Sequence, residues 1–533
     1  MSSEIVRYIN KKDAELLHEI ELAANQSDHD TALRLTEDRL AKPIDLSRPS
    51  ERLLKGSLAG WLIDIGTESG QEQIVKKGLS ILENEEAVLR KNVTQASYDY
   101  NIGNAYSSLF DLKKSKPGFK LNPSEIQDIV KSKSRYWRAY KSLQTHDRAF
   151  WAKLWVNLGN CLLKCNRVVE AIIYYDDVIT EYPKFPQANA SRADALLKLN
   201  EISDTYSINL LAQAIEGYSV ASDFADTLYN RQAWHMRSEL LKQKLLEHGY
   251  DSKNIEHETS ETESEHNQHS KYRKFCLEQH LSLSEHSIYC GCAGARSDDL
   301  TVPKSSGPIG GNFVPRMEFI LNRVKSEFTF ARLMYYQAVL PLESEWDLLE
   351  DEIRITQLFE DEMHGPRSEM LRLSFRNCFA ILDKIAMAIC ELFELAQPKE
   401  VLYFESFWRS RWERINQIDN PAIVALYALA TDLNSKTGDW PEFKEWRNAI
   451  EHRIFCVLQK ENFHSDPYSV VNQNAGDLVV PLDVFHQRAL FLLRLTRSAI
   501  FSFVFCVRYE GSKLTEGDPS KAITLRGRNE ESG

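Results

Sequence analysis

Apolar residues recur at helical spacing along most of the chain. In residues 367–396 an apolar stripe with a period close to 3.6 runs from Leu371 to Phe393. Similar patterns, interrupted by short polar turns, run through residues 1–250 and predict successive helical hairpins. Little of the chain shows the pattern that is typical of strands. The expected fold class is therefore all-α.

The C-terminal part of the chain, residues 366–510, is predicted to be a bundle of about four helices. The predicted helices span residues 367–396, 421–434, 441–461 and 482–508. Pro441 stands in the first turn of the third helix, where the missing N–H is tolerated. Residues 511–533 are polar, and we expect them to form a disordered tail.

One predicted pair of helices, at residues 155–183, carries a recognisable pattern. The segment resembles a tetratricopeptide repeat at six positions: Trp155, Leu158, Gly159, Ala171, Tyr175 and Pro183. A weaker match to the same repeat pattern, YNIGNAYSSL, begins at residue 100. Another helix pair is expected near residues 51–66 and 70–85. Because such repeats bury their faces only by stacking, we expect residues 1–250 to form a solenoid of tetratricopeptide type that binds a protein or peptide.

The helical pattern is lost between these two regions. Residues 251–271 contain almost nothing apolar and are expected to be a polar linker, and residues 272–365 a connecting segment with a long helix at 316–340. The connecting segment contains five residues of types that bind zinc: Cys276, His280, His286, Cys290 and Cys292. Their spacing is not that of a standard zinc finger, so we expect buried thiols and loop histidines, with a zinc site as the alternative.

Charge restricts where a nucleic acid can bind. The chain has 533 residues and a formal net charge of −12, which excludes an extended basic coat. Residues 366–510 hold 17 Lys or Arg against 18 Asp or Glu, so nearly all of the acidic excess lies elsewhere. We therefore expect a nucleic acid to approach only the C-terminal part.

Other features of the sequence indicate a cytoplasmic protein without a membrane partner. The N-terminal residues are polar and lack the apolar core of a signal peptide. The longest apolar run, near residues 489–507, contains Arg494 and Arg497, which argues against a membrane span. Nine scattered cysteines show no disulfide framework. The sequence contains no phosphate-binding loop, no dinucleotide fingerprint and no H-E-x-x-H motif.

The predicted third helix separates apolar and polar residues onto opposite faces. At roughly 100° per residue, its core face carries five apolar residues: Phe443, Trp446, Ile450, Ile454 and Val457. Asn448 and His452 lie almost opposite, together with Phe455. Arg447 lies at the flank, four residues before Glu451, so an ion pair between them is sterically available. We expect His452 to face either solvent or an interface marked by Phe455.

A second candidate site is the segment FWRSRWERI at residues 407–415. Arginines alternate with tryptophans in this segment: Arg409, Arg411, Arg414, Trp408 and Trp412. Arginine pairs with phosphates and tryptophan stacks on bases, so the pattern is typical of a surface that contacts single-stranded RNA. The alternative is a helix that packs both tryptophans inside and exposes its arginines to water.

The sequence from Arg447 to His452, RNAIEH, resembles the signature of HEPN domains, in which His follows Arg at a spacing of four to six residues. The resemblance covers residues 366–510, and the motif stands on the polar face of the third helix of an expected helical bundle. It implies a metal-independent endoribonuclease without a cofactor. It also implies a homodimer, in which two HEPN domains pair and RNA binds in the cleft between them.

The resemblance assigns a role to each residue of the motif. The RNA 2′-hydroxyl attacks the neighbouring phosphate and leaves a cyclic phosphate end. His452 would transfer protons, because imidazole titrates close to physiological pH. Arg447 would hold the phosphate through its bidentate fork. Asn448 would orient the imidazole or the RNA, and Glu451 would position Arg447.

Three functions stay open at this point. The first is a HEPN endoribonuclease that acts in antiviral defence, with the repeats as a sensor arm. The second is a scaffold without enzymatic activity, whose repeats bind a protein and whose bundle dimerises. The third is a HEPN toxin that a separate antitoxin holds inactive. A scaffold tolerates His452→Ala, a ribonuclease does not, and a toxin is poisonous when it is produced alone.

Overall fold

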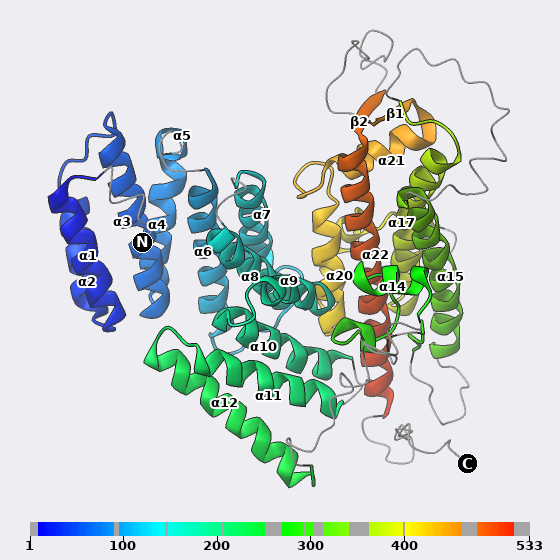
Figure 1. Ribbon diagram of the computed structural model, residues 1–533, viewed down its shortest axis with the longest axis horizontal. Helices are drawn as coiled ribbons and strands as arrows, with labels where there is room; N and C mark the ends of the chain where they lie inside the picture. Colours follow the sequence, from blue (N-terminus) through cyan, green and yellow to red (C-terminus); the bar gives the residue numbers. More distant parts are fainter. Residues whose placement is uncertain are drawn as a thin grey trace. The chain divides into compact units, whose positions relative to one another are not determined.

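The fold is almost wholly α-helical, as the hydrophobic pattern predicts (Figure 1). A computed structural model describes residues 9–89, 95–143, 148–203, 207–250, 269–291, 295, 297–302, 313–340, 362–397, 400–459 and 477–515. The chain divides into two compact units, Met1–Cys165 and Asn166–Gly533. The boundary between them falls inside residues 155–183, the segment with the best repeat pattern.

The N-terminal unit consists of helices that pack in consecutive pairs. Its helices are α1 (Lys11–Asn25), α2 (His29–Leu40), α3 (Pro49–Glu68), α4 (Glu72–Asn84), α5 (Glu86–Leu89), α6 (Gln95–Lys114), α7 (Gln127–Lys141) and α8 (Arg148–Lys164). Close packing within a pair depends on glycine. A Cβ on Gly103 of α6 would lie 2.6 Å from the Tyr136 ring of α7, and one on Gly78 of α4 would lie 2.6 Å from the Ala59 carbonyl of α3. The pairs α3–α4 and α6–α7 thus pack close to where the sequence predicts helix pairs, and the assignment of residues 1–250 as tetratricopeptide repeats stays a prediction.

The second unit begins with four further helices, which pack one on the next. They are α9 (Val168–Glu181), α10 (Pro186–Ile202), α11 (Ile208–Asp223) and α12 (Leu228–Glu247). Residues 251–268, most of the predicted polar linker, lie outside the described residues. The last residue of that linker, Lys271, already begins α14 (Lys271–Glu278), and the short turn η3 (His286–Ile288) follows.

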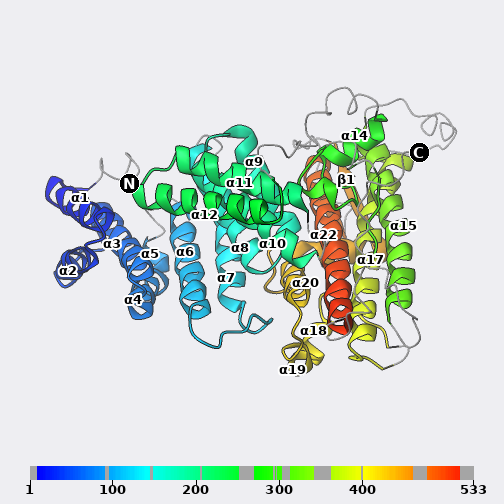
Figure 2. The same ribbon diagram turned by 90° about the horizontal axis from the view of Figure 1, so that it is seen from below.

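A helical bundle makes up the rest of the second unit. Its long helices are α15 (Val314–Val339), α17 (Pro366–Leu392), α20 (Pro421–Asp432) and α22 (Leu482–Thr515). Figure 2 shows α15, α17 and α22 side by side, and α20 packs on α22. We expected α15 to lie in a connecting segment outside the bundle, and this was wrong. Residues on one face of α15, such as Leu321 and Phe328, are fully buried against the neighbouring helices.

Helix α22 passes through the middle of this bundle. It is long and apolar enough to cross a membrane, but 83 % of its most apolar window is buried inside the protein, as in a core helix. Its arginines hold the segment that precedes α15: Arg497 Nε donates to the Ser282 carbonyl at 2.7 Å, and Arg494 Nε to the Gln279 carbonyl at 2.9 Å. The helix continues to Thr515, so the expected disordered tail does not begin at residue 511. Residues 516–533 lie outside the described residues.

The third predicted helix is shorter than its sequence pattern indicates. Helix α21 (Glu442–His452) ends at His452, and strand β1 (Phe455–Leu458) follows in place of the expected helix to residue 461. β1 pairs in parallel with β2 (Leu478–Pro481). Arg453 already has extended backbone angles, with φ −144° and ψ −172°. Ile454 and Val457 therefore do not lie on the core face of a helix.

Candidate active site

The position of α21 in the bundle is set by its apolar face. Phe443, Trp446 and Ala449 are buried, and the Phe375 ring of α17 lies 5.5 Å from that of Phe443. Glu442 and Glu445 stand in the first turn, where a negative charge interacts favourably with the helix dipole and stabilises the helix. The opposite face is left accessible, and it carries Arg447, Asn448, Glu451 and His452, as the helical projection predicts.

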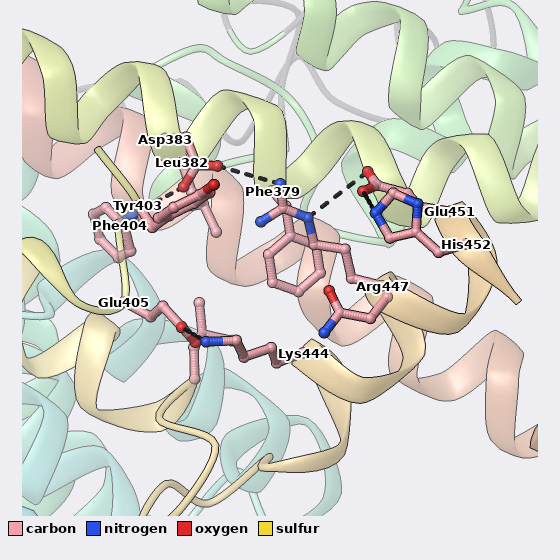
Figure 3. A pocket seen from close by; sticks show the side chains of 12 residues that line it. Phe379, Leu382, Asp383, Tyr403, Phe404, Glu405, Lys444, Arg447, Glu451 and His452 are labelled. Atoms are coloured by element: carbon pink, nitrogen blue, oxygen red, sulfur yellow. Dashed lines mark hydrogen bonds and ion pairs between the residues drawn. The ribbon is translucent and has the colours of Figure 1, made fainter. Parts of the chain in front are cut away.

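This face of α21 forms one wall of a pocket of about 260 Å³. The opposite walls come from α17 and from the segment that follows it (Figure 3). The pocket is lined by Phe379, Leu382, Asp383, Tyr403, Phe404, Glu405, Leu433, Lys444, Arg447, Asn448, Glu451 and His452. The pocket therefore brings together all four residues that the motif singled out.

The Arg447 side chain lies between two carboxylates of the pocket. Its Nη2 atom lies 3.5 Å from Asp383 Oδ2, and its Nε atom lies 3.8 Å from Glu451 Oε1. The guanidinium also lies over the Phe379 ring, 5.3 Å from the ring centre. Figure 3 shows it reaching across the pocket between the two carboxylates. This cation is thus oriented before any ligand binds, and its neighbours leave it accessible at the pocket wall.

Asp383 is a site residue that the sequence analysis missed. Burial raises the pKa of its carboxyl above the ordinary value, against the opposing effects of the Phe404 N–H and Arg447. The Phe404 N–H donates to Asp383 Oδ1 at 2.9 Å, which fixes the carboxyl and leaves Oδ2 facing Arg447. Asp383 lies 64 positions before Arg447 in the chain, so only the packing of α17 against α21 brings them together.

His452 is far more accessible than Arg447. It is 70 % exposed, and its Nε2 atom lies 3.6 Å from Glu451 Oε2. The ring therefore stands at the open side of the pocket, with a carboxylate beside it. Lys444 adds a second cation, which pairs with Glu405 across the pocket. The arrangement offers a proton-transfer group, two cations and an amide to an anionic ligand.

The structure corrects the expectation for Phe455. It lies in β1 and is only 5 % exposed, with its ring 5.0 Å from that of Phe485 and 5.9 Å from that of Trp446. Its carbonyl accepts a hydrogen bond from Arg372 at 2.6 Å. A side chain that is buried in this way cannot contact RNA, so Phe455 contributes to the packing beneath α21 and not to the RNA surface.

The segment at 407–415 is also different from its expected form. It folds as two single turns, α18 (Phe407–Ser410) and α19 (Trp412–Ile415). Trp408 is buried and donates through Nε1 to the Phe404 carbonyl at 2.7 Å, so it cannot stack on a base. Arg411 is held by Glu400 and by the Leu395 carbonyl. Trp408 therefore packs inside, which is the alternative we gave for it, whereas Arg411 is paired and only 11 % exposed, which neither expectation foresaw.

The other residues of that segment border an open cleft of about 600 Å³. Arg409 and Arg414 are exposed there, and Trp412 is partly exposed, with its ring 5.2 Å from that of Tyr427. Contact of Arg409, Arg414 and Trp412 with RNA stays a prediction.

The candidate zinc residues do not converge in the described part of the connecting segment. No group of three or more His, Cys, Asp or Glu in the described residues could hold a metal ion. Cys276 is buried as a free thiol, and the His286 Nδ1 atom lies 3.0 Å from the Tyr289 hydroxyl. Burial beside Arg494 and Arg497 lowers the pKa of His280 to about 3. Cys292 lies outside the described residues.

The similarity of the bundle to known proteins agrees with this geometry. Residues 310–510 match the LA2681-like HEPN family. The match supports a C-terminal HEPN domain, and because it begins at 310 it includes α15, which we had placed outside the domain. HEPN domains are generally ribonucleases, so the match also supports an activity of that type. A search of curated proteins found no match to the chain.

Proposed function

We propose that this chain is a metal-independent endoribonuclease, and that Arg447, Asn448 and His452 of its HEPN domain carry out the cleavage. The observation that carries the proposal is the pocket beside α21. There the Arg447 guanidinium is oriented by Asp383 and Glu451, and His452 stands at the open side. A cation next to a proton-transfer group is what cleavage of a phosphodiester needs.

In the proposed reaction the 2′-hydroxyl oxygen of a ribose attacks the adjacent phosphorus. The bond from phosphorus to the 5′-oxygen breaks, and a 2′,3′-cyclic phosphate remains. The proton that leaves the 2′-hydroxyl and the proton that reaches the 5′-oxygen both need a carrier, and His452 is the imidazole of this pocket. Arg447 stabilises the charge that develops on the phosphate oxygens, and Asn448, one turn before His452, orients the ring or the RNA.

A homodimer is part of the proposal. Two exposed apolar side chains stand beside the motif, since Tyr403 and Ile454 are 49 % and 56 % exposed, and Val401, two positions before Tyr403, is 74 % exposed. Tyr403 lines the pocket itself, and Ile454 follows His452 by two residues. Pairing two copies through this face would cover these side chains and bring two His452 rings to one cleft, so that one could serve as base and the other as acid.

The cellular role that we propose is a cytoplasmic toxin or antiviral effector, whose helical arm binds a protein or peptide that controls cleavage. The alternative is a scaffold that dimerises through the bundle and has no activity. Induction of the wild type, Arg447→Ala and His452→Ala in cells separates the two. The proposal expects growth arrest and RNA fragments with cyclic phosphate ends from the wild type alone, with all three proteins folded.

The experiment has a matched control in His18→Ala. The His18 side chain is 67 % exposed, and its Nδ1 atom lies 3.7 Å from Glu21 Oε2, which closely resembles the surroundings of His452. His18→Ala should behave as the wild type. If His452→Ala also behaves as the wild type, both on induction and during phage infection, the ribonuclease proposal fails and the scaffold remains.

A further inference from the structure

The N-terminal unit contains a strongly basic surface in a chain of negative net charge. From the start of α7 to the end of α8, residues 127–164, the chain holds 8 Lys or Arg and 2 Asp or Glu. The sequence as a whole has a formal net charge of −12. The acidic excess therefore does not extend over α7 and α8, which lie next to one another (Figure 2). An anionic partner can approach this part of the unit, contrary to our expectation that a nucleic acid approaches only the C-terminal part.

Five of these cations are exposed: Lys131 near the start of α7, and four that stand nearer the segment between α7 and α8. These four are Arg138 and Lys141 on α7, and Arg148 and Lys153 on α8. Others serve the fold itself, since Arg135 pairs with the buried Asp99 at 2.9 Å. The exposed cations therefore come from both helices, and Arg138, Lys141 and Arg148 stand in the turns of α7 and α8 next to the segment that joins them.

The same two helices carry a continuous cluster of aromatic rings. Trp151 and Trp155 stand four residues apart on α8, with ring centres 5.6 Å apart. The Tyr140 ring of α7 lies 4.6 Å from that of Trp155, and the Trp137 ring lies 6.0 Å from it. Trp137 is buried and supports the cluster, whereas Tyr140 is 39 % exposed and Trp151 and Trp155 are partly exposed.

We infer that Tyr140, Trp151, Trp155, Arg138 and Lys153, which we name the α7–α8 surface, bind single-stranded RNA. Accessible rings offer stacking platforms to unpaired bases, and the surrounding cations pair with the phosphates. An acidic peptide would use the cations and leave the rings without a partner. A duplex would use the phosphate contacts alone, because its bases are already stacked and paired.

This inference goes beyond the proposed cleavage, since the α7–α8 surface holds RNA without reacting with it. Nothing in it depends on Arg447 or His452. It assigns to the N-terminal unit a ligand of the same chemical class as the proposed substrate, in addition to any protein that the repeats bind.

Binding of a labelled oligonucleotide tests the inference. The protein is the full chain with His452→Ala, so that the RNA stays intact, and the probe is a fluorescent single-stranded RNA of about 12 nucleotides, within the usual site size. We expect Tyr140→Ala to weaken binding about tenfold, as for loss of one stacked base, and Tyr140→Phe to retain it. Log affinity decreases linearly with log salt concentration. Replacing both Arg138 and Lys153 by Ala should make that slope less steep by about 1.4, as for two lost phosphate contacts.

Two substitutions outside the α7–α8 surface are matched controls. Lys42→Ala removes an exposed lysine of the same unit, and Tyr229→Ala removes a tyrosine that is 79 % exposed on α12. Both should bind as the parent does. The inference is overturned if Tyr140→Ala also binds as the parent does, or if a duplex or polyglutamate competes as well as single-stranded RNA. Ultraviolet crosslinks within residues 127–164 are the expected independent result, and their confinement to residues 310–510 would overturn it.

Discussion

The buried ion pairs around Arg167 allow a stability prediction that can be worked out from the structure. Arg167 follows the boundary residue Asn166 and is 3 % exposed. Its guanidinium binds both carboxylate oxygens of Glu170, at 2.7 and 2.8 Å, and donates to Asp432 Oδ2 at 2.7 Å. Asp432 is the last residue of α20 and is 1 % exposed. Arg167 thus joins α9 to the bundle.

Replacing Arg167 by Met removes the cation and leaves two carboxylates buried beside each other. Loss of one partner from a buried pair costs about 3–5 kcal/mol, because the remaining charge is desolvated without compensation. We expect Arg167→Met to lower the free energy of unfolding of the second unit by that amount. The control is Arg316→Met, since Arg316 pairs with Glu391 in water, with 49 % and 41 % of the two side chains exposed. An exposed pair of this kind contributes less than about 1 kcal/mol.

Urea unfolding followed by circular dichroism measures the difference. Two compact units can unfold in separate transitions, so the transition to compare is the one that Phe375→Ala displaces, because Phe375 is fully buried in the bundle. If Arg167→Met and Arg316→Met shift that transition equally, the reasoning about the buried pairs is refuted.

Two further predictions concern Asp383 and His280. Asp383→Asn removes the charge that orients Arg447, and it should lower kcat for RNA cleavage about tenfold, or about 1.4 kcal/mol, with the helical spectrum unchanged; equal kcat would contradict this positioning role. Burial lowers the pKa of His280 to about 3 in the folded chain. The unfolded chain therefore binds more protons below pH 6.5, and the free energy of unfolding decreases as the pH drops. Asn is the replacement of choice because it tolerates the φ of +54° at this residue. Between pH 6.5 and 4.5, His280→Asn should lose about 1–2 kcal/mol less of its free energy of unfolding than the wild type does, allowing for the partial exposure of the ring. Unfolding curves at the two pH values check this, and an unchanged pH dependence would count against it.

Helices that bury one face over several turns could be predicted from the sequence. The stripe that begins at Leu371 predicts α17, and its members as far as Ile389 are buried in the bundle. The end of α21 could not be predicted in the same way. Ile454 and Val457 continue the helical pattern, yet Phe455–Leu458 form β1 and pair with Leu478–Pro481, about twenty positions later. Pairing over that distance leaves no local signal.

The polar face of α21 was predicted correctly, but its neighbours were not. Projection of the helix places Asn448 and His452 away from the core, and both are exposed. The approach of Asp383 to Arg447 depends on how α17 packs against α21, which periodicity does not specify. Trp408 is the opposite case. Its alternation with arginines is typical of an RNA surface, yet its indole is buried and hydrogen-bonded to the Phe404 carbonyl.

The most direct test of the account is the chemistry of the RNA ends that the purified full chain produces. A labelled single-stranded RNA is incubated with the wild type, Arg447→Ala, His452→Ala and the control His18→Ala, and the new 3′ ends are analysed. We expect 2′,3′-cyclic phosphate ends from the wild type and His18→Ala, and intact RNA with the other two. Equal cleavage by His452→Ala, or fragments that end in a 3′-hydroxyl, would contradict it.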